Sequence, residues 1–228
     1  MPITACVFDA YGTLFDVTAA ARAAAAEPGG ERLAAIWPKL AEDWRRKQLE
    51  YSWLRAITGA HADFAQVTAD GLDWALEAAG IADEALRARL LALYDRLAAY
   101  PEVPAMLAAL QARGFATAIL SNGAPAMLAA ATASAGIGDR LDAVLSVEQA
   151  GVFKPAAKVY DLVGQRFGCA PGAVLFVSSN GWDAAAATGY GFTTAWVNRA
   201  GAPLDRLPWR PAHILPDLTA IPDLASRL

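Results

Sequence analysis

Asp9 is the first residue of the chain whose type and position could support chemistry. It directly follows an apolar stretch, Thr4 to Phe8, and Gly12, a residue type that tolerates the backbone angles of a tight turn, comes three residues later. A carboxylate placed in this way could attack an electrophile, but it could equally form a turn or cap a helix. The residues around Asp9 alone leave both interpretations open.

Lys154 and Asp183 could complete a charged cluster with Asp9. Lys154 precedes Pro155, and proline is favoured as the first residue of a helix, so we expect the lysine side chain to project over the strand ends. A lone lysine is ordinarily solvated instead. Asp183 could pair with Lys154, yet the spacing Asn180-x-x-Asp183 is also typical of a helix cap.

Polar residues also end two further apolar stretches. Ser121 and Asn122 follow one stretch, and Ser178 closes another. Because ligands of open α/β sheets bind beyond the carboxyl ends of the strands, we expect these groups near a ligand site. Ser121 and Asn122 could instead cap a helix that begins near Pro125.

The elements that must position these residues are short apolar stretches alternating with helical patterns. Strands that alternate with helices form a parallel sheet. Strands that are apolar throughout are covered by helices on both faces. The sequence therefore predicts an α/β fold with a doubly wound, Rossmann-like parallel sheet. The predicted strands are Thr4 to Phe8, Phe115 to Leu120, Ala143 to Ser146, Val174 to Ser178 and Thr193 to Val197.

The long segment between the first two strands contains no convincing strand and exceeds an ordinary connection. Apolar residues recur in it at three- and four-residue spacing, which predicts amphipathic helices, and the alanine-rich stretch Ala19 to Ala26 also reads as helix. We therefore expect residues 15–98 to form a helical cap inserted into a core made of residues 1–14 and 99–228. The recurring positions are Leu33, Trp37, Leu40, Trp44, Gln48 and Tyr51, then Leu72, Leu76, Leu86, Leu90 and Tyr94.

The composition indicates a folded protein that does not bind nucleic acid. The 228 residues are 56% hydrophobic and 18% charged, which suffices for a core and excludes disorder. A net charge of −4 gives no electrostatic footprint for nucleic acid. Cys6 and Cys169 lie far apart and are expected in the core, which indicates a reduced, cytoplasmic protein. Neither a signal peptide nor a membrane span is expected.

Four motifs occur in order along the chain: DAYGTLFD at 9–16, SNG at 121–123, Lys154-Pro155, and VSSNGWD at 177–183. Together they resemble the haloacid dehalogenase superfamily, and specifically the L-2-haloacid dehalogenases. The segment WRRKQLEYSWLR at 44–55 is similar to the same family, so the resemblance covers essentially the whole chain.

This resemblance implies hydrolytic dehalogenation of short L-2-haloalkanoic acids to D-2-hydroxyalkanoic acids. Asp9 would displace halide from the α-carbon, and water would hydrolyse the resulting ester, so that the product has inverted configuration. The family is often dimeric, which implies a homodimer. We expect no cofactor, no metal and neither nucleic acid nor membrane as a partner.

The resemblance also implies roles for individual residues. Lys154 would hold the carboxylate of Asp9. Arg45 would bring a planar guanidinium from the cap to an anionic substrate. Without the family match, Arg45 would be interpreted as an ordinary solvated helix residue. Tyr160 and Trp182 match positions of the family, but aromatic side chains on core elements usually serve in packing. The further catalytic residues would be Thr13, Ser178, Asn180 and Asp183, and those that bind substrate or halide would be Ala10, Tyr11, Arg45, Ser121, Asn122, Tyr160 and Trp182.

Two positions distinguish the chain from the phosphatases of the same superfamily. Those enzymes carry a second Asp as general acid where this chain has Tyr11, and halide, unlike an alkoxide, leaves without a proton. They hold magnesium with a further acidic group where this chain has the run Ser178 to Asn180, although Asp183 remains. The pattern favours substitution at carbon; a phosphatase and a noncatalytic protein that keeps the fold are the alternatives.

Overall fold

A six-stranded parallel sheet forms the centre of the computed structural model, which describes residues 1–17, 22, 25–26 and 31–228. Its strands are β1 (Ala5–Phe8), β2 (Ala116–Ser121), β3 (Ala143–Ser146), β4 (Val174–Ser178), β5 (Thr193–Val197) and β6 (His213–Leu215). The order across the sheet is β3-β2-β1-β4-β5-β6, so β1 lies in the interior with β2 and β4 as its neighbours.

The predicted α/β fold and its first five strands are confirmed, whereas β6 was missed. This strand has only three residues and pairs with β5 alone. Its central residue, Ile214, is 53% exposed. An edge strand this short lacks the apolar run by which buried parallel strands are recognised.

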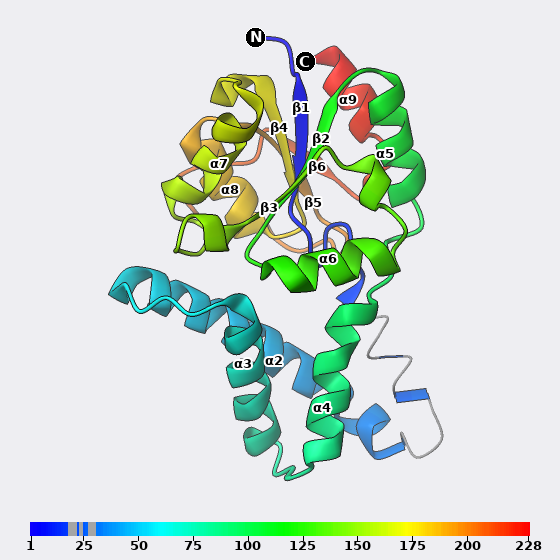
Figure 1. Cartoon of the computed structure of the whole chain (residues 1–228), viewed down its shortest axis with the longest axis vertical. Helices are drawn as coiled ribbons and strands as arrows, with labels where there is room; N and C mark the ends of the chain where they lie inside the picture. The colour runs from blue at the N-terminus through cyan, green and yellow to red at the C-terminus, as the bar shows by residue number, and fades with distance from the viewer. Residues whose placement is uncertain (18–21, 23–24, 27–30) are drawn as a thin grey trace.

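Helices cover both faces of the sheet, as Figure 1 shows: α7 and α8 lie on one side, and α5 and α9 lie on the other. Helices connect the first five strands as the crossovers of a doubly wound fold, whereas the segment between β5 and β6 contains no helix. The bounds are α5 (Val103–Ala112), α6 (Pro125–Ser134), α7 (Ala157–Phe167), α8 (Gly181–Tyr190) and α9 (Ile221–Arg227), with short 3-10 helices η2 (Gly138–Arg140), η3 (Val147–Gln149) and η4 (Pro171–Ala173).

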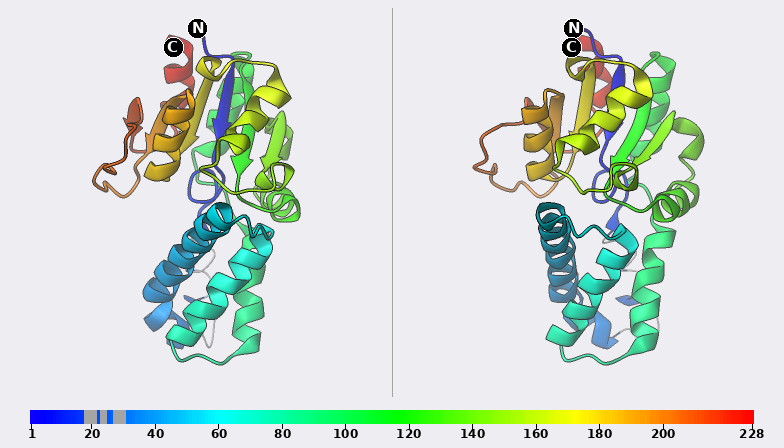
Figure 2. Two further views of the ribbon diagram at one scale, coloured as in Figure 1. Left: turned by 90° about the vertical axis from the view of Figure 1, so that its left-hand side faces the viewer. Right: turned by 60° about the vertical axis from the view of Figure 1, so that its left-hand side comes forward.

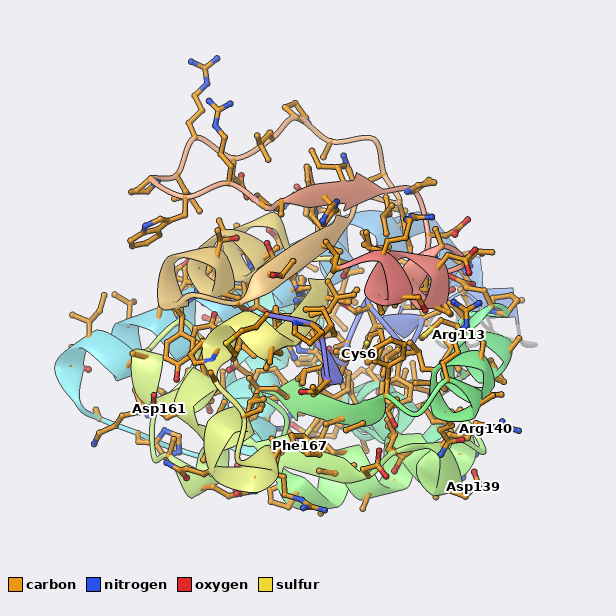
Figure 3. All side chains as sticks on the ribbon, turned by 90° about the horizontal axis from the view of Figure 1, so that it is seen from above. Cys6, Arg113, Asp139, Arg140, Asp161 and Phe167 are labelled. Carbon is orange, nitrogen blue, oxygen red and sulfur yellow. The ribbon has the colours of Figure 1, made fainter. Side chains whose placement is uncertain are left out.

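Cys6 lies at the centre of the sheet, surrounded by core side chains, when the molecule is seen along the strands (Figure 3). Its side chain is fully buried, and this burial raises the pKa of the thiol to about 12. The prediction of a core position is confirmed for Cys6. It holds only in part for Cys169, which is half-buried and packs against the core from its edge.

A helical unit extends beyond the carboxyl ends of the strands (Figures 1 and 2). It consists of α2 (Glu31–Thr58), α3 (Phe64–Ala78), α4 (Glu84–Ala92) and η1 (Leu93–Arg96). The predicted amphipathic helices are confirmed, because Trp37, Trp44 and Leu72 belong to a second buried cluster inside this unit. The predicted helix at Ala19 to Ala26 falls mostly outside the described residues. No described helix is both long and apolar enough to span a membrane.

Two adjacent segments connect the helical unit to the sheet. The backbone of Tyr100 donates to the carbonyl of Leu14 over 2.9 Å, and that of Asp16 donates to the carbonyl of Ala98 over 3.0 Å. Phe15 and Ala99 form an antiparallel bridge between these contacts. The segments that leave and re-enter the core therefore support each other.

Gln48 is a fully buried polar residue within the helical unit. Its amide nitrogen donates to Thr68 Oγ1 and to the hydroxyl of Tyr94, each over 3.0 Å. A buried polar group is tolerated when its hydrogen bonds are satisfied, so Gln48 connects α2 to α3 and to η1 without an unpaired donor.

We predict that Gln48→Ala lowers the free energy of unfolding by about 1–3 kcal/mol, because it leaves buried polar groups of Thr68 and Tyr94 without a partner. Gln66→Ala is the control, since Gln66 lies on α3 with an exposed side chain that donates to Asp70. The control is expected to change stability by no more than about 0.5 kcal/mol. Urea unfolding of both variants provides the measurement, and equal small losses would show that the buried network is not stabilising.

Candidate active site

The loop that follows β1 places Asp9 beyond the end of the sheet. The backbone of Asp9 donates to the carbonyl of Val177 over 2.9 Å, which extends the pairing of β1 with β4 by one residue. The chain then turns back at Gly12, whose φ of 82° lies in the left-handed region. A Cβ atom at Gly12 would also lie 3.2 Å from Ser179 Oγ, a tight contact that adds to the preference for glycine set by the backbone angle.

Three donors surround the carboxylate of Asp9, a residue that is only 7% exposed. Lys154 Nζ lies 3.2 Å from Oδ1. The other oxygen, Oδ2, accepts from Asn180 Nδ2 over 2.9 Å and from Thr13 Oγ1 over 3.1 Å. The side chain is thus held in one orientation from three parts of the chain, as a nucleophile requires.

Lys154 lies between two carboxylates. Its Nζ is 2.8 Å from Asp183 Oδ2, and both side chains are almost completely buried. Burial lowers the pKa of Lys154, but Asp183 and Asp9 outweigh this effect and raise the pKa above its ordinary value. Burial raises the pKa of Asp183, against the opposing charge of Lys154. Lys154 is therefore a buried cation that both carboxylates stabilise.

The structure decides between pairing and capping for Asp183. Asn180 is the N-cap of α8 but makes no side-chain capping bond, because its Oδ1 accepts from Arg45 and its Nδ2 donates to Asp9. Asp183 accepts from Lys154 and, over 2.8 Å, from the hydroxyl of Tyr160. Both side chains thus serve the charged cluster rather than the end of the helix.

The segment around Lys154 differs from the prediction. Helix α7 begins at Ala157, and Pro155 lies in the preceding turn, so the prediction that this proline is the first helical residue was wrong. The backbone N–H of Lys154 donates to Asn122 Oδ1 over 3.0 Å, a bond made outside the helix. Asn122 therefore positions Lys154 through its backbone.

Ser121 and Asn122 do not cap the next helix, as one alternative proposed. The N-cap of α6 is Ala124, which has no side-chain capping bond. Ser121 Oγ instead accepts from the backbone of Gly123 over 3.1 Å, and Ser178 Oγ accepts from the backbone of Asn180 over the same distance. The two serines shape equivalent turns at the ends of β2 and β4.

A cavity of about 540 Å³ lies between the loops that follow β1 and β4 and the helical unit. Arg45 on α2 and Tyr11 line it together with Asn180, and Arg45 Nη2 donates to Asn180 Oδ1 over 3.0 Å. This bond connects the helical unit to a residue that contacts Asp9. The cavity can therefore hold an anion beside Arg45 and close to the carboxylate.

The remaining predicted residues lie around this centre. Ala10 is buried, and its carbonyl accepts from the backbone of Thr13. The ring of Trp182 lies 5.4 Å from that of Trp53 on α2, in an edge-on arrangement. Tyr160 lies behind Asp183, with its ring packed against Phe176, and is not among the residues that line the cavity.

Arg199 is a neighbour of the site that the motifs did not reveal. It follows β5, donates to the carbonyl of Thr13 over 3.3 Å and pairs with Glu102 over 2.7 Å. Its guanidinium lies 3.7 Å from the centre of the Tyr100 ring. Arg199 thus connects the nucleophile loop to the segment that re-enters the core. A polar residue after the predicted strand at 193–197 was the only signal for it in the sequence.

The described residues contain no group of three or more His, Cys, Asp or Glu side chains that could hold a metal ion. The positive charge between Asp9 and Asp183 is the ammonium of Lys154. The cluster of Asp9, Lys154 and Asp183 is thus centred on a protonated lysine side chain.

The fold and the site define a Rossmann-like α/β protein with a buried, hydrogen-bonded aspartate after its first strand. The chain belongs to the haloacid dehalogenase-like hydrolases, whose family model matches residues 3–191. The family resemblance predicted from the four motifs is confirmed.

Individual relatives are similar over most of the chain. (S)-2-haloacid dehalogenase 1 of Pseudomonas sp. (strain CBS-3) is 43% identical over 230 residues, which cover 100% of this chain and 98% of that protein. (S)-2-haloacid dehalogenase of Xanthobacter autotrophicus is 48% identical over 200 residues, covering 86% of this chain and 76% of the relative. The solved structure of L-2-haloacid dehalogenase from Xanthobacter autotrophicus with chloropropionic acid covalently bound has a TM-score of 0.84 at 41% identity, and covers 97% of this chain and 98% of that one.

We predict that Lys154→Met lowers the free energy of unfolding by about 3–5 kcal/mol, because it leaves two buried carboxylates without their cation. Lys158→Met is the matched control, since Lys158 lies exposed on α7 only four residues away. Its expected change is within about 0.5 kcal/mol. Urea unfolding at neutral pH measures both, and a loss in Lys154→Met no larger than that of the control would contradict the proposed importance of the ion cluster.

Proposed function

We propose that this chain hydrolyses L-2-haloalkanoic acids to D-2-hydroxyalkanoic acids, with Asp9 as the nucleophile. The observation that carries the proposal is the carboxylate of Asp9, which is buried and held by Lys154, Asn180 and Thr13. Asn180, which donates to Asp9, also lines the cavity that contains Arg45. The names of the relatives described above support the same substrate class.

The reaction has two steps. An oxygen of Asp9 attacks the α-carbon from the side opposite the halogen, and the electron pair of the carbon–halogen bond leaves with the halide. Water then attacks the carbonyl carbon of the Asp9 ester. One proton of this water goes to the departing oxygen of the hydroxyacid, the other is released to solvent, and Asp9 is a carboxylate again. The new hydroxyl oxygen of the product therefore derives from Asp9. The α-carbon is attacked once, so its configuration is inverted.

Charge moves from the carboxylate to the halide during the first step. Arg45 offers a planar set of donors to the substrate carboxylate or the departing halide. Lys154, whose raised pKa keeps it charged, remains beside the ester oxygen as Asp9 loses its negative charge and regains it on hydrolysis. Asp183, supported by Tyr160, holds Lys154 in place.

The leaving group explains the residue at position 11. Halide departs as a stable anion, so a second acid next to the nucleophile is not needed, and Tyr11 can serve as an apolar wall. Its ring stacks on Phe64 of the helical unit with 6.0 Å between the centroids. Thr13, Ser178, Ser121 and Asn122 contribute by shaping the loops that carry Asp9, Asn180 and Lys154.

The helical unit acts as a cap in this proposal, with residues 15–98 inserted into a core of residues 1–14 and 99–228. A homodimer is supported by Leu54 and Ile57, which are 51% and 81% exposed on α2 and offer apolar area for an interface. The cytoplasmic location stays a prediction from the sequence.

We predict that, with enzyme in excess over 2-chloropropionate in heavy-oxygen water, the first product carries unlabelled oxygen. That oxygen comes from the Asp9 carboxylate, and label then appears in Asp9. Mass spectrometry of the product and of the peptide that contains Asp9 measures both. Label in the first-turnover product would instead mean that water attacks the α-carbon directly, with Asp9 as a general base.

We also predict that Arg45→Lys lowers turnover of 2-chloropropionate by about 30- to 1000-fold, because lysine retains the charge but loses the planar donors that contact Asn180 and the substrate.

Arg46→Lys is the matched control for this prediction. Arg46 is the next residue along α2, its side chain is 48% exposed, and it pairs with Asp43 and Glu50. We expect its turnover to stay within about twofold of the parent. Thermal unfolding of both variants is measured in parallel: near-normal turnover of Arg45→Lys, or equal losses in both variants with lowered melting, would contradict the role of Arg45.

A further inference from the structure

The cavity that Asn180 lines next to Asp9's hydrogen-bond partners extends well beyond Arg45. Its polar end is formed by Gly12, Arg45, Ser179 and Asn180. Among the residues that the structure describes, the rest of its wall is mostly apolar and belongs to α2, to η1 and to the segments that connect the helical unit to the core. The apolar lining residues include Val17, Trp37, Pro38, Ala41, Leu93 and Leu97.

Helix α2 gives this extension its direction. Arg45 and Trp37 both line the cavity and lie eight residues apart in the same helix, a separation of about 12 Å along its axis. From its carboxyl-terminal end near the sheet, α2 runs back into the helical unit, away from the strand ends (Figures 1 and 2). The cavity therefore leads from Asn180 at the sheet into the interior of the helical unit.

The size of the cavity exceeds the needs of a short haloacid. A volume of about 540 Å³ is in the range that accommodates drug-sized ligands. A three-carbon acid is only a few times larger than a water molecule, whose share of liquid volume is about 30 Å³. Such an acid, anchored at Arg45, would not reach Trp37, which lies about two helical turns away.

The polarity of the residues that line the cavity determines which kind of ligand can occupy the space beyond Arg45. Ala41 and Leu93 are half-buried, so part of each side chain can face the cavity. Trp37 and Leu97, 9% and 1% exposed, instead close its wall with little accessible area. Arg22 and Glu42 also line the cavity, and both are exposed, which places them at its opening to solvent. An occupant that reaches Trp37 from Arg45 must be an anion at one end and a hydrocarbon along its length.

We infer that the preferred substrates of this chain are 2-haloalkanoic acids with a long alkyl substituent on carbon 2, which lies along α2 from Arg45 to Trp37. This inference rests on the proposed dehalogenase function and goes beyond it, because the chemistry at Asp9 requires only the halogenated carbon and its carboxylate. Ala41 lies halfway along the wall and determines how much chain the cavity admits.

The test measures bromide release from 2-bromopropionate, 2-bromobutanoate, 2-bromohexanoate and 2-bromooctanoate over a range of concentrations that gives kcat and KM separately. Each added methylene group that leaves water for the apolar wall is expected to raise kcat/KM by about threefold to fourfold. The increase belongs to binding of the chain, so it appears mainly in KM. Bromide is the leaving group throughout, so the reactivity of the carbon–halogen bond stays comparable.

Two variants locate the chain in the cavity. Ala41→Leu extends a side chain into it and is expected to lower the ratio of kcat/KM for 2-bromooctanoate to that for 2-bromopropionate at least tenfold. Ala35→Leu is the control, because Ala35 is exposed on the same helix and is not among the lining residues; it should leave the ratio as in the parent. Thermal unfolding verifies that both variants are folded.

The possible outcomes distinguish failure of the long-chain subsite from failure of the proposed dehalogenase function. Release from 2-bromopropionate with kcat/KM that falls along the series, or a ratio that Ala41→Leu does not lower, overturns the long-chain subsite and leaves the dehalogenase function intact. If no member of the series releases bromide, the dehalogenase function is wrong and the subsite is wrong with it.

Discussion

The ion cluster of one lysine and two aspartates is the constraint on which the site depends. Lys154 Nζ lies 3.2 Å from Asp9 and 2.8 Å from Asp183, and the lysine is 1% exposed. Removing these charges from water is costly unless each finds charged partners and hydrogen bonds. Thr13, Asn180 and Tyr160 provide the additional donors. The end of β1, the turn before α7 and the first turn of α8 must therefore meet at one point.

The parallel sheet makes this convergence possible. Its strands run in one direction, so the loops after β1, β2 and β4 all emerge at the same edge, where the helical unit also lies. Arg45 then reaches Asn180 from the helical unit, and Arg199 reaches the carbonyl of Thr13 from the loop after β5. The groups around Asp9 come from distant parts of the sequence, and each is held by backbone that the sheet has already placed.

The sequence predicted the parts of this arrangement that leave a local pattern. Apolar runs marked five strands, and the motifs marked Asp9, Lys154 and Asp183 because each combines a distinctive residue type with a distinctive neighbour. The sequence alone could not show whether Asn122 caps a helix. Its side-chain oxygen instead accepts from the backbone N–H of Lys154, a residue that is distant in sequence. Arg199 and β6 were missed for a similar reason: their contacts are made in space, and a single arginine or a three-residue edge strand has no periodicity.

The groups that make Asp9 reactive and the residues that would select the substrate lie in different parts of the molecule, the sheet with its loops and the helical unit. The groups that contact Asp9 directly, Lys154, Thr13 and Asn180, all belong to the sheet and its loops. Most of the apolar wall of the cavity belongs to α2 and η1, and α2 is supported from within the helical unit by Gln48, Thr68 and Tyr94. A substitution such as Ala41→Leu can therefore change the space offered to a substrate without contacting the carboxylate that attacks it. Arg45 is the exception, because it lines the cavity from α2 and bonds to Asn180, so the two properties meet at this residue.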